Sequence, residues 1–169
     1  MKTTLFYLIF ILICWGCTKE KSDNLTQFTE LSFYFTTDTS VRTVLDIDNI
    51  QIEGDPFIPY SEIVSYDSAR HILELDHRID TLFDYTGNYD GRGFVAMLDT
   101  TKIYCGALYS PIHSSTNPNI VITLPCDEIS GDHCLQILEG YPNEDYYAGH
   151  SDVNDPRIIE LLKRDHKLN

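Results

Sequence analysis

Six histidines are the residues of this sequence best suited to bind a metal, because neutral imidazole is a common metal ligand. No two of them have the H-x-x-x-H spacing that places both imidazoles on one face of a helix. They are His71, His77, His113, His133, His150 and His166. We therefore expect solvated or helix-capping histidines, and we predict neither a metal nor a cofactor.

Two oxygen-rich segments have side chains that a hard cation would prefer. The first, Thr86-x-Asn88-x-Asp90-Gly91, has Thr at the first position of a calcium loop and would have Met97 in place of the bidentate glutamate at the twelfth. We interpret it as a glycine turn that leads into a strand. The second segment contains Asp145, Asp152, Asn154 and Asp155. Asp155 is better explained as a helix cap, which leaves a cation site there as the less favoured alternative.

No pattern of catalytic nucleophiles stands out. The sequence has no G-x-S-x-G elbow, and Ser114 and Ser115 are too close to His113 in sequence to predict a triad, which is assembled in space. Cys105 has apolar neighbours, which favour an inert thiol. Carboxylate pairs such as Asp127-Glu128 arise by chance in so acidic a chain, whereas a glycosidase needs two acids across a cleft. We predict no enzyme, with a cell-envelope hydrolase that uses carboxylates as the alternative.

Three tyrosines form the most suggestive cluster. Tyr141, Tyr146 and Tyr147 share the segment 140–154, which is polar and is predicted to be a long surface loop. Tyrosines beside acids on a loop favour a recognition surface for a protein or a glycan. The alternative is that the three rings pack the loop back onto the sheet.

The charge of the chain excludes one class of partner. The 12 Lys and Arg residues stand against 26 Asp and Glu residues, a formal net charge of −14. Without Lys2, which belongs to the leader described next, the remaining basic residues number 11 and the net charge becomes −15. Phosphate contacts need Lys and Arg, so we predict no nucleic-acid partner.

The first seventeen residues resemble a bacterial lipoprotein signal. Lys2 is followed by an apolar run over 5–15 and then by Gly16 and Cys17. These eleven residues fit the core of a signal peptide, about 7–15 residues, and are fewer than the ~20 that span a bilayer. The resemblance implies cleavage after Gly16 and lipid on Cys17. An ordinary secretory signal and an uncleaved anchor are the alternatives.

This leader implies an organisation for the rest of the chain. Residues 1–16 are the signal peptide, 17–28 a lipidated tether, and 29–169 a single folded domain. The lipid on Cys17 attaches the domain to a membrane of the cell envelope, with the outer membrane or the cell surface as the expected location. The predicted function is that of a lipid-anchored, exported binding or interaction module. A structural or inhibitory envelope lipoprotein is a further alternative.

Export makes disulfides possible for the three cysteines of the domain. Cys126 and Cys134 flank a short polar segment between two apolar ones, and we predict that they pair. Such a bridge would stabilise the fold by ~2–3 kcal/mol. Cys105 alternates with Ile103 and Ala107 and is predicted to be a small buried residue on the same strand face as these two.

Period-two alternation of apolar residues predicts most of the elements. Strands are expected over 31–36, 41–52, 120–124 and 135–138, with a break at Gly54-Asp55-Pro56 and a turn at 59–62. Hairpins are expected from 63–66 with 71–75, and from 94–98 with 103–109. Helices are expected over 78–85 and after the Asp155 cap with Pro156 at the first position. The fold class is therefore α+β, with a mainly antiparallel sheet of about seven or eight strands, one short helix and a C-terminal helix.

Several segments together resemble a family of small, uncharacterised bacterial lipoproteins. They are Ile63-Val64-Ser65-Tyr66-Asp67, His71-Ile72-Leu73-Glu74-Leu75, Lys102-Ile103-Tyr104-Cys105-Gly106-Ala107, Gly140-Tyr141-Pro142 and Asp155-Pro156-Arg157-Ile158. More distantly, 94–112 is similar to the periplasmic head domain of the SecD translocase subunit. Neither resemblance implies a catalytic residue.

Overall fold

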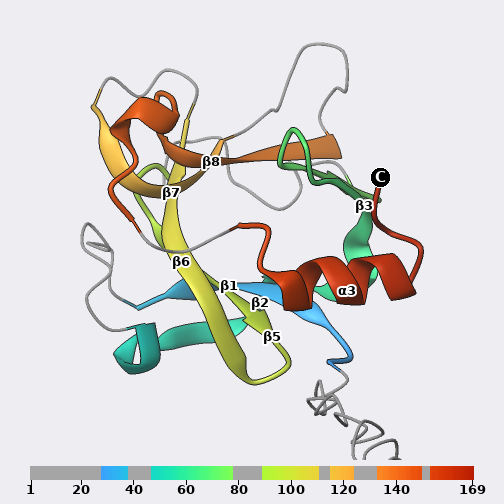
Figure 1. Cartoon of the computed structure of the whole chain (residues 1–169). Helices are drawn as coiled ribbons and strands as arrows, with labels where there is room; N and C mark the ends of the chain where they lie inside the picture. The colour runs from blue at the N-terminus through green and yellow to red at the C-terminus, as the bar shows by residue number, and fades with distance from the viewer. Residues whose placement is uncertain (1–27, 38–46, 78–88, 111–114, 124–132, 150–152) are drawn as a thin grey trace, which may run out of the picture.

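The computed structural model describes residues 28–37, 47–77, 89–110, 115–123, 133–149 and 153–169. These residues form one mostly antiparallel eight-stranded sheet and one α-helix, which confirms the α+β class (Figure 1). The order of strands in the sheet is β2-β1-β5-β6-β7-β8-β4-β3. The strands are β1 Leu31–Thr36, β2 Ile52–Ile58, β3 Ile63–Asp67, β4 Ile72–Leu75, β5 Gly93–Leu98, β6 Thr101–Tyr109, β7 Asn117–Thr123 and β8 Cys134–Tyr141.

The sheet is rolled, because its two edge strands are consecutive in the chain. β2 and β3 lie at opposite edges, yet only the 3₁₀ turn η2 (Tyr60–Glu62) and Pro59 separate Ile58 from Ile63. Five residue steps reach at most about 18 Å, whereas a flat sheet of eight strands is about 34 Å wide. The edges must therefore curve toward each other, and Figure 1 shows β1, β2 and β5 facing β8 across the molecule.

The helix α3 (Pro156–Arg164) covers the gap between the edges and completes the core. Asp155 accepts a hydrogen bond from the backbone N–H of Arg157, and Pro156 occupies the first turn, as predicted. Ile158, Leu161 and Leu162 are buried on one side of the helix. They join a single core to which every strand contributes, with Phe33, Phe94 and Tyr104 in ring contact at its centre.

The C-terminal residues form hydrogen bonds with the linker 59–62, which joins the two edge strands. Lys167 Nζ donates to the carbonyls of Tyr60 and Ile63, and its ammonium lies 4.5 Å from the centre of the Tyr60 ring. Tyr60 Oη donates to Asp165 Oδ2 at 2.7 Å. The backbone of Tyr66 in β3 bonds Lys167 and Asn169, so the tail covers the outer edge of that strand.

The hairpin β5–β6 confirms the prediction of two paired strands but corrects the predicted faces. The turn is shorter than expected, since β6 begins at Thr101 and Asp99 takes a positive φ of 50°. The register shifts after Ala96, which leaves Ile103 in a bulge. Ile103 therefore packs toward the main core, while Cys105 lies opposite Val95 in a small cluster on the other face.

The prediction for the segment before β3 was wrong in two respects. In place of a strand through 41–52, residues Ile47–Asn49 form a 3₁₀ turn, and 41–46 lie outside the described residues. The expected break at Gly54-Asp55-Pro56 is a bulge inside β2, where Gly54 has a φ of 60°. Pro56 is tolerated because β2 is an edge strand and its missing N–H removes no inner ladder bond.

Of the other predicted elements, some are confirmed, one has a different start, and one lies outside the described residues. The turn at 59–62 and the hairpin β3–β4 are confirmed, whereas the predicted helix over 78–85 lies outside the described residues. The strand predicted over 120–124 begins earlier, at Asn117, and it pairs with β6 in parallel. None of the helices in the described ranges is long and apolar enough to cross a bilayer.

Candidate functional site

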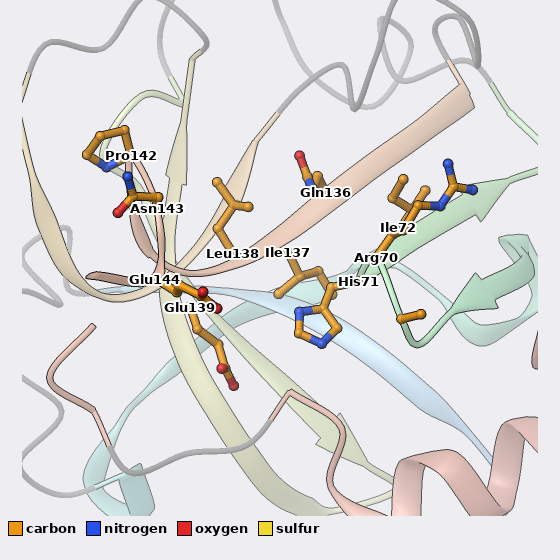
Figure 2. A pocket seen from close by; sticks show the side chains of 11 residues that line it. Arg70, His71, Ile72, Gln136, Ile137, Leu138, Glu139, Pro142, Asn143 and Glu144 are labelled. Carbon is orange, nitrogen blue, oxygen red and sulfur yellow. The ribbon is translucent and has the colours of Figure 1, made fainter. Parts of the chain in front are cut away.

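A cleft of about 590 Å³ opens on the side of the sheet where β4 meets β8 (Figure 2). Three segments that are far apart in the sequence line it: the hairpin turn 69–72, the β8 residues 136–139, and 142–144 from the segment that follows β8. Side chains alternate along β8, so Ile137 enters the core while Gln136 and Leu138 point to the opposite side of the strand (Figure 2). Gln136, Leu138 and Ile72 of the neighbouring strand thus form the floor.

The hairpin turn forms one wall of the cleft and is held by Asp67, the last residue of β3. Asp67 Oδ1 accepts hydrogen bonds from the backbone N–H groups of Ala69 and Arg70, both at 3.0 Å. Arg70 Nε donates to Asp67 Oδ2 at 2.6 Å, and this bond lowers the pKa of the Asp67 carboxyl. The Arg70 side chain is still 63% exposed, so its guanidinium can be reached from the cleft.

The segment that follows β8 forms the other wall and depends on a glycine. Gly140 has a φ of 85°, and a Cβ at this position would lie 2.7 Å from the backbone nitrogen of Tyr147. After a cis peptide bond at Tyr141-Pro142, Asn143 Oδ1 accepts from the backbone N–H of Asp145 and begins the 3₁₀ turn η4 (Glu144–Tyr146). These contacts fix Asn143 and Glu144 at the rim of the cleft.

Two ionisable side chains at the cleft take part in structural contacts. The amide of Asn154 donates to His71 Nε2 at 3.1 Å and to the carbonyl of Ser68. Asn154 Oδ1 accepts from Tyr66 Oη at 2.9 Å, so the hairpin turn is tied to the start of α3. Glu139 Oε1 accepts a long hydrogen bond, 3.4 Å, from the backbone of Val153.

A smaller cleft of about 190 Å³ adjoins the first and shares Arg70 and Ile72 with it. It lies over Ser65, Glu74 and Asn169, which are hydrogen-bonded to one another through the Ser65 hydroxyl. The two clefts together form an exposed surface of mixed polar and apolar character along β3, β4 and β8.

The structure does not bring the three predicted tyrosines into one exposed patch. Tyr146 is 46% exposed in η4. Tyr147 packs against the main core, whereas Tyr141 packs on the other face of the sheet with its ring 5.3 Å from that of Tyr109. The alternative in which the rings hold the segment on the sheet therefore describes Tyr141 and Tyr147. The same segment still reaches the cleft, but through Pro142, Asn143 and Glu144.

The cysteines fall into two groups. Cys105 is a free thiol, 1% exposed, and its burial raises its pKa to about 11, which makes it a poor nucleophile. Cys134 is buried at the start of β8, and Cys126, its predicted disulfide partner, lies outside the described residues. The lipidation residue Cys17 also lies outside them, so both predictions stand as predictions.

Sequence reasoning missed one further cluster. Glu62, Asp76 and His77 meet where β3 begins and β4 ends, with one ligand atom from each within 4.8 Å of the others. A signal was available, because the predicted hairpin pairs the residues that flank these three. Helical spacing of histidines does not detect such a cluster, because its residues flank two paired strands.

Comparison of the chain with protein-family models, with curated proteins and with solved structures gave no match. The site therefore has to be interpreted from its own geometry.

Proposed function

We propose that this protein is a lipid-anchored, exported binding module, and that the cleft beside β4 and β8 binds a segment of a protein partner. The observation that carries this proposal is the open cleft, which combines a floor of Ile72, Leu138 and Gln136 with a polar rim at Arg70 and Asn143. Such a mixture of apolar contact and hydrogen-bonding groups suits recognition.

Binding is favoured over hydrolysis by the chemistry of the lining. Within the described lining there is no serine, threonine or cysteine that could act as a nucleophile. His71 and Glu139 are already hydrogen-bonded to Asn154 and to the backbone of Val153. An acid or base needs a free path to the substrate proton, whereas both side chains point to the side opposite Gln136 and Leu138, away from the floor of the cleft (Figure 2).

A protein segment fits the cleft better than a glycan does. No aromatic side chain belongs to the described lining, so a sugar ring would lack a flat apolar face to stack on. The rim carries Glu144, Asp145 is exposed beside it, and the chain as a whole is strongly acidic. A basic segment of the partner would complement this charge and be steered toward it.

The position of the cleft agrees with attachment through the predicted tether. The carbonyl of Phe28 accepts a hydrogen bond from Arg164 Nη1 at 2.6 Å, so the described chain starts beside the end of α3. In Figure 1 this start lies at the lower end of the molecule, whereas β8 and the segment after it lie at the upper end. A tether that leaves at the lower end would present the cleft away from the membrane.

Cross-linking in intact envelopes, followed by purification of the protein, tests the proposal. Gln136→Arg fills the cleft floor and opposes a basic ligand, and we expect it to remove the specific cross-linked partners. Tyr146→Ala tests the exposed tyrosine beside the rim. Ile52→Arg, an exposed position on β2 at the other edge of the sheet, is the control and should retain the partners. Partners that survive Gln136→Arg, with the fold intact by circular dichroism, would contradict the assignment of the cleft.

A further inference from the structure

The hairpin β3–β4 places three potential metal ligands together at its open end. Ile63 pairs with Leu75, so Glu62 and Asp76, the next residues outward, lie side by side. The backbone N–H of Asp76 donates to the carbonyl of Glu62 at 2.9 Å, which fixes the distance between the two backbones. His77 follows, and its Nδ1 contacts Asp76 Oδ1 closely. One ligand atom from each of the three residues lies within 4.8 Å of the other two.

A second observation at this place indicates a missing partner. Glu62 Oε2 is buried, yet no group in the described part of the chain forms a hydrogen bond with it. Glu62 Oε2 is the one buried side-chain polar atom of the described residues that lacks a partner. Leaving a carboxylate oxygen dry and unpaired is unfavourable, because burial removes water without replacing its hydrogen bonds. A bound cation would supply the missing interaction.

We propose that Glu62, Asp76 and His77 form a binding site for a divalent transition metal, with Zn²⁺ as the best-suited ion. Two carboxylates and one imidazole form a mixed oxygen and nitrogen donor set of the kind that Zn²⁺ accepts. Ca²⁺ and Mg²⁺ prefer oxygen ligands alone, so the imidazole selects against them. Three protein ligands leave a fourth position of a tetrahedral ion for water or for an external ligand.

The site is open to ions from solution and is separate from the cleft. The side chains of Asp76 and His77 are 46% and 59% exposed, so an ion can reach them without opening the fold. The cleft uses the turn of the same hairpin, whereas this cluster uses its open end. The metal site therefore does not depend on the function proposed for the cleft.

Zinc titration of the purified full-length protein, stripped with a chelator, tests the proposal. We expect saturation at one Zn²⁺ per chain through this cluster. The thermal midpoint should rise by roughly 5–10 °C at a zinc concentration ~100-fold above Kd. Equimolar Mg²⁺ should leave the midpoint unchanged. The absence of any saturable zinc binding would overturn the proposal.

Single substitutions assign the ligands. Asp76→Asn and His77→Gln change exposed side chains, so we expect folded proteins that bind Zn²⁺ at least tenfold more weakly. Glu62→Gln should also weaken binding, because a neutral amide is a poorer metal ligand than a carboxylate. Asp145→Asn, the same kind of change at an exposed aspartate in η4 beyond the opposite end of β8, is the matched control and should bind like the wild type.

A cobalt spectrum provides a readout that separates ligation from a general effect on folding. Co²⁺ bound at the cluster should give visible ligand-field bands that change in His77→Gln and persist in Asp145→Asn. Zinc affinity and cobalt bands that are the same in all three cluster variants as in the wild type would show that the metal binds elsewhere and would refute the site.

Discussion

Replacing Gly106 by alanine tests how β6 and β7 pack against each other. The two strands run in parallel, and Gly106 pairs with Ile120. A Cβ on Gly106 would lie 2.0 Å from the carbonyl oxygen of Ile120 and 2.9 Å from the Phe94 ring, whereas real Cβ contacts essentially never fall below 3.0 Å. The new methyl group would therefore push β7 away by about 1 Å, if β6 and Phe94 stay in place.

The expected loss of stability follows from this displacement. Overpacking of a close-packed interior costs about 1–3 kcal/mol, and each weakened ladder bond adds about 1 kcal/mol. We expect Gly106→Ala to lower the free energy of unfolding by roughly 3–5 kcal/mol, which for a domain of this size lowers the thermal midpoint by roughly 6–20 °C. Urea denaturation followed by far-UV circular dichroism measures the change.

Gly54→Ala is the matched control. Gly54 has a φ of 60° but no atom within 4 Å of the position that a Cβ would take. Its replacement should cost only the backbone penalty of about 1–2 kcal/mol. A Gly106→Ala protein as stable as the Gly54→Ala protein would show that β6 and β7 do not approach each other as described.

Two further predictions concern charge and thiols. The hydrogen bond from Arg157 lowers the pKa of Asp155 in the folded protein. The ionised Asp155 therefore contributes its full stabilisation above the pKa of an unfolded aspartate, ~4. This contribution is lost as the pH falls through the lower pKa of the folded state. Asp155→Asn should reduce the loss of stability as the pH falls below about 4, measured by urea melts at each pH, and an unchanged pH profile would contradict this role. Cys105 should resist alkylation until the protein unfolds because it is buried and its pKa is raised, whereas non-reducing mass mapping should find Cys126 joined to Cys134. A bridge that contains Cys105 would refute that pairing.

Local patterns in the sequence predicted the helix and strands whose formation depends on residues close together in the chain. The start of α3 follows from Asp155 and Pro156, and the hairpin β3–β4 follows from two apolar runs around a polar turn. The alternation of apolar residues did not reveal the bulges. Each bulge adds one residue to a strand, and this extra residue moves every residue after it to the opposite face. This is why Ile103 and Cys105, predicted to share a face, point to opposite sides.

The candidate sites depend on long-range pairing and could be predicted only in part. The cleft joins residues 69–72 to 136–139 through the pairing of β4 with β8, which no local pattern indicates. The tyrosine segment was correctly associated with an exposed part of the surface, but two of its rings are used for packing. Glu62 and Asp76 could have been found from the register of the predicted hairpin.

Mass spectrometry of the mature N-terminus, isolated from envelopes, tests the central claim most directly. The account predicts that Cys17 is the first residue and carries lipid, and that Cys17→Ser releases the protein from the membrane fraction. An unmodified Cys17 thiol, or a cytosolic protein that still carries residues 1–16, would contradict it.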